Sequence, residues 1–160
     1  MNATIREIKA NDNHYVEKII KSTFIEFKLP LKGTAYEDIE TTQMFESYQN
    51  NGDIYFVIEE NNNVLGGGGI KALKDNRENI CELQKMYFDP LIRGKGYGQL
   101  LIEKCLQFAK EFGYDKCYLE TLPELKAAIN LYKKNGFTLL DSSLGSTGHS
   151  SCNIWMIKNL

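Results

Sequence analysis

The central segment of the chain reads Cys81-Glu-Leu-Gln-Lys-Met-Tyr-Phe-Asp-Pro90, then Leu91-Ile-Arg-Gly-Lys-Gly-Tyr-Gly98, then Gln99-Leu-Leu-Ile-Glu-Lys-Cys-Leu-Gln-Phe-Ala-Lys-Glu-Phe112. Residues 80–88 are rich in apolar, β-branched and aromatic side chains, which predicts a strand. Pro90 ends this strand, because proline has no N–H to give to a sheet ladder. The third part predicts a helix, since apolar residues recur at helical spacing: Leu101, Cys105, Phe108 and Phe112.

The turn between the strand and the helix holds three glycines and two cations in six positions, from Arg93 to Gly98. Glycine lets the backbone adopt positive φ and come close to a ligand. Because a helix follows directly, its first N–H groups have no internal partner and carry the positive end of the helix dipole. Such a turn is typical of a phosphate site. Glycine spacing alone leaves a tight turn with solvated charges as the alternative.

Two common phosphate loops do not fit this turn. A Walker loop ends in Gly-Lys-Ser/Thr, whereas Gly94-Lys95 is followed by Gly96. A Rossmann fingerprint needs G-x-G-x-x-G, whereas these glycines are spaced G-x-G-x-G. A nucleotide-binding protein with a Walker loop or a Rossmann fingerprint is therefore disfavoured.

Two motifs carry a resemblance to a known family. Arg93, Gly96 and Gly98 fit the pattern Arg/Gln-x-x-Gly-x-Gly/Ala, which resembles the acetyl-CoA-binding motif of the GNAT superfamily of N-acetyltransferases. Farther along the chain, Leu131-Tyr132-Lys-Lys-Asn-Gly136-Phe137 resembles the L-Y-x-x-x-G-F signature of the same family. Because the motifs occur in the expected order, each with its expected secondary structure, the resemblance extends from about Ile5 to the C-terminus.

The rest of the chain predicts a mixed α/β fold. Strands are expected at residues 4–8, 53–60, 64–73, 80–88, 116–120, 137–140 and 153–158, and helices at 13–29, 41–49, 99–112 and 121–135. The resemblance implies the acyl-CoA N-acyltransferase fold, with a mostly antiparallel sheet of about seven strands flanked by about four helices. In that fold the fourth and fifth strands, here 80–88 and 116–120, splay apart. We find no repeat or linker and expect a single N-acetyltransferase domain over residues 1–160.

Composition excludes several classes of protein. The chain is 42% hydrophobic with a net charge of -2, so it has no basic field for nucleic acid. No apolar run approaches the ~20 residues of a membrane span, and the N-terminus lacks the apolar centre of a signal peptide. We therefore expect a cytoplasmic protein without nucleic-acid or membrane partners. The four cysteines and two histidines are widely separated, which predicts neither disulfides nor a metal site.

The resemblance implies acetyl transfer from acetyl-CoA to an amine. Backbone groups of the central strand would hold the pantetheine and the thioester carbonyl, and N–H groups of the turn would hold the pyrophosphate. The side chains of Arg93 and Lys95 would either add charge there or remain exposed cations. The cofactor residues implied are Met86, Tyr87, Phe88, Arg93, Gly94, Lys95, Gly96, Tyr97 and Gly98.

Two residues are candidates for acid–base catalysis. Glu82 lies on the central strand, where apolar surroundings would raise its pKa. It would act as the base, directly or through water; the alternative is a paired or solvated carboxylate. Tyr132 is the candidate acid for the departing thiolate, the alternative being a core aromatic. Many family members carry Asn seven residues before this Tyr, where the chain has Leu125, which puts cofactor contacts from this helix in doubt.

The leading hypothesis is thus an N-acetyltransferase that acts on a primary amine of a small molecule or peptide by direct attack in a ternary complex. A non-catalytic acyl-CoA-binding module is the alternative. A homodimer is left open, and the residues do not identify the acceptor. The run Gly66–Gly69 in the strand at 64–73 is interpreted either as a bulge or close backbone crossing, or as room for a substrate.

Overall fold

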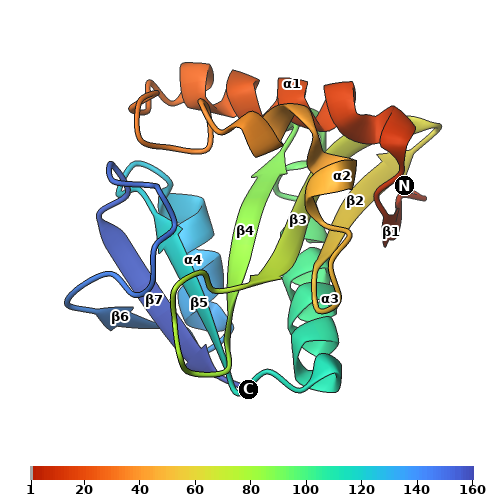
Figure 1. The fold of residues 1–160 in the computed structure, drawn as a ribbon. Coiled ribbons are helices and arrows are strands. Elements are labelled where there is room, and N and C mark those ends of the chain that lie inside the picture. Colours follow the sequence, from red (N-terminus) through yellow and green to blue (C-terminus); the bar gives the residue numbers. More distant parts are fainter. Residues whose placement is uncertain (1) are drawn as a thin grey trace.

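A computed structural model describes residues 2–160, which form one seven-stranded sheet with helices on both faces (Figure 1). The strands are β1 (Thr4–Glu7), β2 (Ile54–Glu60), β3 (Asn63–Ala72), β4 (Ile80–Phe88), β5 (Lys116–Thr121), β6 (Thr138–Leu140) and β7 (Ile154–Asn159). The helices are α1 (Asn13–Glu26), α2 (Met44–Ser47), α3 (Tyr97–Phe112) and α4 (Lys126–Lys134), with short 3-10 turns at Ala10–Asp12, Ile39–Thr42 and Pro90–Ile92.

The strand order is β1-β2-β3-β4-β5-β7-β6, and every neighbouring pair is antiparallel except β4 and β5. This arrangement confirms the expected mixed α/β fold with a mostly antiparallel sheet. Within residues 2–160, no helix has the length and apolar character needed to cross a membrane.

Two hydrophobic cores lie on opposite faces of the sheet. In β2, Phe56 packs into the core that contains α3, whereas its neighbour Tyr55 packs into the core that contains α1, because successive strand residues point to opposite faces. Ile20 and Phe24 of α1 and Leu101 of α3 are at most 1% exposed. Burial of each such side chain away from water contributes about 1.5–3 kcal/mol to the stability of the fold.

The parallel strands β4 and β5 pair along only part of their length. Their register runs from Ile80 opposite Lys116 to Glu82 opposite Tyr118 and then ends. Beyond this point the strands diverge toward the end of the sheet that α1 crosses (Figure 1). The predicted splay of the fourth and fifth strands is therefore confirmed.

A β-bulge bends β4 where the gap opens. Gly69 of β3 pairs with Gln84, but Gly67 pairs with Tyr87, so β4 carries one extra residue in this interval. Lys85 lies in the bulge with φ of 50°, an unusual value for a residue with a side chain. The hydroxyl of Tyr55 donates a hydrogen bond to the Lys85 carbonyl at 2.7 Å and fixes the bulge.

The glycine run of β3 is explained by close packing. A Cβ on Gly67 would lie 2.6 Å from the ring of Tyr55, and one on Gly69 would lie 2.6 Å from the carbonyl oxygen of Ile54. The run also faces the bulge of β4. These contacts support the bulge interpretation over room for a substrate.

Helix boundaries depart from the prediction in three places. The helix expected at 121–135 begins later than predicted, because Thr121 pairs with Ile154 as the last residue of β5 and α4 starts only at Lys126. The helix expected at 41–49 divides into the 3-10 turn Ile39–Thr42 and the short α2. Helix α3 begins at Tyr97, two residues before the expected start, so the last glycine of the turn lies in its first turn.

Candidate active site

A cavity of about 680 Å³ occupies the gap between β4 and β5. The end of α1, the turn after β4 and the helix α4 enclose it. Of the residues predicted to bind the cofactor or act in catalysis, eight line this cavity: Met86, Tyr87, Phe88, Arg93, Gly94, Gly96, Gly98 and Tyr132. Lys95, Tyr97 and Glu82 are not part of its lining.

The glycine-rich turn is built as an open cradle. Asp89 accepts a hydrogen bond from the N–H of Leu91 at 2.9 Å and starts the 3-10 turn. Gly94 and Gly96 then have φ of 71° and 85°, which favour glycine, and a Cβ on either would meet no atom of the described chain within 4 Å. Gly96 is the N-cap of α3, so the free N–H groups of that helix begin at the cavity.

The Arg93 side chain links this turn to the end of α1. Its Nη1 lies 2.5 Å from Oε2 of Glu26, and its Nε donates to the carbonyl of Phe88 at 2.9 Å. The guanidinium also lies 5.3 Å from the ring centre of Phe27. Arg93 therefore positions the turn through protein contacts.

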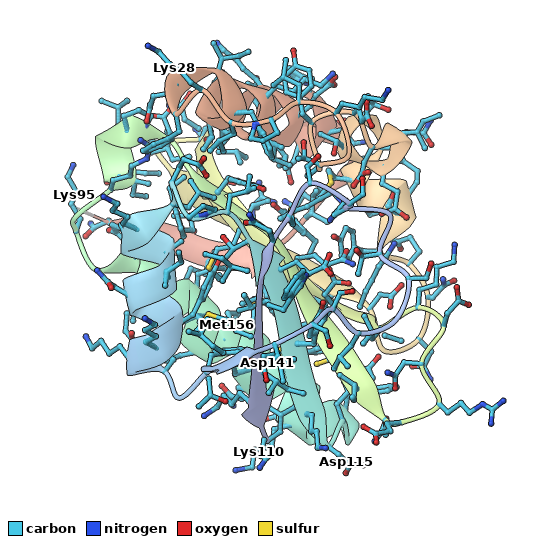
Figure 2. The ribbon with its side chains drawn as sticks, turned by 90° about the vertical axis from the view of Figure 1, so that its left-hand side faces the viewer. Lys28, Lys95, Lys110, Asp115, Asp141 and Met156 are labelled. Atoms are coloured by element: carbon cyan, nitrogen blue, oxygen red, sulfur yellow. The ribbon has the colours of Figure 1, made fainter. Side chains whose placement is uncertain are left out.

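The remaining predicted turn residues lie outside the cavity lining, whereas two lysines of α4 that were not predicted line it. Lys95 is exposed and points away from the fold (Figure 2). Tyr97 is only 9% exposed and packs into the core with α3. Lys126 and Lys134 of α4 do line the cavity. These two lysines were missed, because nothing in the sequence indicates which face of α4 meets the gap.

Tyr132 lies in the hydrophobic core and also lines the cavity. It is 7% exposed, packs into the core and contacts the ring of Phe137 with centroids 6.0 Å apart. Its side chain also lines the cavity, and its hydroxyl makes no hydrogen bond to another residue in the described range 2–160. Burial raises its pKa, so the phenol keeps its proton at neutral pH. Leu125 lines the same cavity, so the position of the family Asn supplies an apolar contact.

A second cavity of about 260 Å³ adjoins the first. Residues 141–153, between β6 and β7, form most of its wall, and Glu120 and Cys152 line both cavities. Burial raises the pKa of the Cys152 thiol to about 12. The thiol therefore stays protonated and is a poor nucleophile.

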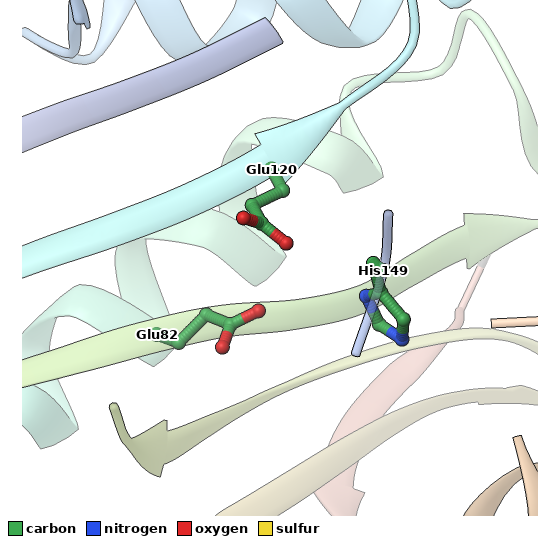
Figure 3. A group of neighbouring side chains, drawn as sticks. All are labelled: Glu82, Glu120 and His149. Atoms are coloured by element: carbon green, nitrogen blue, oxygen red, sulfur yellow. The ribbon is translucent and has the colours of Figure 1, made fainter. Parts of the chain in front are cut away.

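Three ionisable side chains meet where the cavities join. Glu82 from β4, Glu120 from β5 and His149 from the 141–153 segment face one another, with one oxygen or nitrogen of each within 4.8 Å of the others (Figure 3). Burial raises the pKa of Glu82 to about 7, although a hydrogen bond from Gln84 opposes the rise. Glu82 therefore changes charge near neutral pH.

Neutral donors hold the Glu120 carboxylate. The hydroxyl of Tyr118 donates to its Oε2 at 2.6 Å, and the hydroxyl of Thr147 donates to its Oε1. Within residues 2–160, Glu82, Glu120 and His149 are the one group with the residue types and spacing that a metal ion requires. Because protein donors already bind the carboxylates, we assign no ion to it.

Asp38 links the two segments that cover this site. Its Oδ2 lies 2.6 Å from Nε2 of His149 and 3.1 Å from Nζ of Lys85. Burial alone would lower the pKa of His149, but the hydrogen bond and charge of Asp38 raise it overall. These contacts were missed because Asp38 and His149 lie 111 positions apart in segments without periodicity.

Comparison with known proteins identifies the family of the chain. A family model described as the acetyltransferase (GNAT) family matches residues 16–137. The uncharacterized N-acetyltransferase YjgM of Escherichia coli K12 is 40% identical over 157 residues, which cover 98% of this chain and 94% of YjgM.

Two solved structures share the fold at lower identity. A GNAT-family acetyltransferase from Staphylococcus aureus Mu50 superposes with a TM-score of 0.88 at 23% identity, covering 99% of both chains. A phosphinothricin acetyltransferase from Sinorhizobium meliloti, solved in complex with AcCoA, has a TM-score of 0.78 at 21% identity and covers 100% of this chain and 89% of its own.

Proposed function

The chain belongs to the GNAT acetyltransferase family, and on this basis we propose that it transfers the acetyl group of acetyl-CoA to a primary amine of a small molecule. The observation that carries the proposal is the cavity between β4 and β5, which extends from the glycine-rich turn to Tyr132. Its volume of about 680 Å³ leaves room for an extended donor, whose phosphates would lie at one end and whose thioester would lie near the ionisable cluster.

The donor would bind mainly to backbone groups. From Leu83 onward, β4 has no pairing with β5, so pantetheine amides would pair with β4 as an added strand does. The pyrophosphate would accept hydrogen bonds from the N–H groups of residues 94–98, at the positive end of α3. Lys126 and Lys134 would supply cationic charge from the opposite wall. The complex of the Sinorhizobium relative with AcCoA supports this donor.

The transfer would proceed without a covalent enzyme intermediate. The neutral amine nitrogen attacks the thioester carbonyl carbon, and the carbon–sulfur bond then breaks. Tyr132 would protonate the departing sulfur, since its phenol keeps its proton and has no hydrogen-bond partner within residues 2–160. Glu82 is the candidate for the carboxylate that promotes deprotonation of the amine. Because Glu82 lines neither cavity, it would act through an intervening group.

The acceptor would occupy the second cavity. Its volume of about 260 Å³ fits a small molecule, and it joins the first cavity at Glu120 and Cys152. Hydroxyl groups of Ser143, Ser146 and Thr147 are among its lining residues, which favours a hydrophilic amine.

Calorimetric titration with acetyl-CoA, followed by a panel of small amines assayed for thiol release, tests the proposal. We expect saturable donor binding and amine-dependent release of CoA. Absence of binding at millimolar acetyl-CoA would contradict the cofactor assignment. Binding without turnover on any amine would instead indicate a non-catalytic acyl-CoA-binding module.

A further inference from the structure

The three ionisable residues at the cavity junction differ in access. Glu120 and His149 line the second cavity, whereas Glu82 is 4% exposed and lines neither. An amine in the second cavity would therefore meet His149 before Glu82. No motif in the sequence had drawn attention to this histidine.

His149 is held in the orientation that a proton acceptor needs. Its Nε2 lies 2.6 Å from Oδ2 of Asp38. Asp38 also pairs with Lys85, whose side chain is 2% exposed, so the carboxylate is fixed on both sides. When neutral His149 donates the Nε2 proton to Asp38, its other ring nitrogen keeps a lone pair. Figure 3 shows a ring nitrogen of His149 turned toward Glu82 and Glu120.

We propose that His149, oriented by Asp38, takes the proton directly from the acceptor amine; this role rests on the proposed acetyl transfer. The ammonium gives one proton to the imidazole, and the neutral amine then attacks the thioester. As the carbon–sulfur bond breaks, Tyr132 protonates the sulfur, and the second proton lost by nitrogen restores the phenol. The proton on His149 passes to solvent, which its 11% exposed side chain reaches.

The surroundings of His149 stabilise the imidazolium that forms. Asp38 from the 28–43 segment and Glu82 from β4 raise its pKa, while burial and Lys85 lower it, and the net shift is upward from 6.5. Glu120 from β5 and Cys152 from the same loop complete the ionisable groups around it. Because the base must be neutral to accept a proton, kcat/KM should rise with pH through a midpoint above 6.5.

Replacement of His149 by Ala tests the role. We expect turnover to fall on the order of 100-fold or more, with the acetyl-CoA dissociation constant unchanged. Imidazole added to the His149→Ala variant should restore part of the turnover, because it enters the vacated space and accepts the proton from the amine. The matched control is His14→Ala, which removes an exposed histidine near the start of α1 and should leave turnover unchanged.

The Asp38→Asn variant provides a second test, the pH profile of kcat/KM. This profile would not shift if His149 had a purely structural role. Without the carboxylate, the pKa of His149 should fall, and the acid limb of the kcat/KM profile should move to lower pH. Thermal melts of both variants establish that they are folded, and His149→Gln replaces the alanine variant if that one unfolds.

Each negative result has its own meaning. Wild-type protein that acetylates no amine contradicts the proposed function. Active wild-type protein with a folded His149→Ala variant within about threefold of its turnover contradicts only the role of His149. A loss of turnover without imidazole rescue and with an unmoved acid limb in Asp38→Asn likewise assigns His149 to structure.

Discussion

At the scale of single residues, the site depends on groups whose ionisation differs from that in water. Glu82 is buried on β4 with a pKa of about 7, whereas the Tyr132 phenol stays protonated. Both properties follow from burial, which disfavours the charged form of an acid. A buried carboxyl that titrates near neutral pH therefore reduces the stability of the fold at that pH.

Tyr132→Phe separates catalysis from packing. The ring keeps its contacts, and the hydroxyl has no hydrogen-bond partner within residues 2–160, so the free energy of unfolding should change by less than about 1 kcal/mol. Turnover should fall on the order of 100-fold if the phenol protonates the thiolate. Steady-state kinetics with the best amine, a thermal melt and an acetyl-CoA titration measure these effects. Near-normal turnover would assign Tyr132 to the core and leave water as the proton donor.

Glu82→Gln should stabilise the folded protein at alkaline pH. The carboxyl titrates near 4.5 when unfolded but at about 7 when folded, so its effect on stability becomes increasingly unfavourable as pH rises from 4.5 to 7. The variant should gain on the order of 1–3 kcal/mol above pH 7 and nothing below 4.5. Urea unfolding of both proteins across this range measures the difference. An equal difference at every pH would show that Glu82 has an ordinary pKa.

At the scale of elements, the site depends on a bulged strand and a glycine turn. The bulge at Lys85 bends β4 as it leaves β5. The turn that follows brings the start of α3 beside α4, where a Cβ on Gly98 would lie 3.2 Å from Leu131. Glycine at this position therefore allows two helices to approach, while Gly94 and Gly96 shape the backbone of the cradle.

Gly96→Val should abolish measurable acetyl-CoA binding in a folded protein. Its φ of 85° strains any side chain, and the valine would project into the open cradle. Gly113→Val is the matched control, because Gly113 also has positive φ and open surroundings but caps the far end of α3. Both variants should lose on the order of 1–3 kcal/mol of stability, and calorimetry should detect the binding loss only at Gly96. Unchanged acetyl-CoA affinity in a folded Gly96→Val variant would show that the turn is not part of the donor site.

At the scale of the whole molecule, periodicity and motifs predicted more of the fold than of the site. Strand β4 begins and ends where its apolar run indicated, at Ile80 and Phe88, and the turn after it lines the cavity. Local sequence rules failed where strand pairing decided the structure, as at Thr121, which belongs to β5 although the sequence predicted it in the following helix.

The remaining site residues could not be predicted for a different physical reason. Asp38 and His149 come from two irregular segments that are distant in the sequence and meet only after the chain has folded. Arg93 could be assigned to the turn from its motif, but its pairing with Glu26 depends on where α1 ends in space. Spacing in the sequence carries information on neighbours within an element and very little on contacts between loops.

The gap between β4 and β5 is also an unpaired edge in the interior of a sheet. At the outer rim of a sheet, such an edge invites strands of other chains and promotes aggregation. Here Phe24 of α1 and Leu131 of α4 narrow the approach on either side. These side chains and the helices that carry them place the unpaired groups of β4 inside a cavity and not along the outer rim of the sheet. The fold thereby keeps these hydrogen-bonding groups away from the rim, where self-association begins, and leaves space beside them for a ligand.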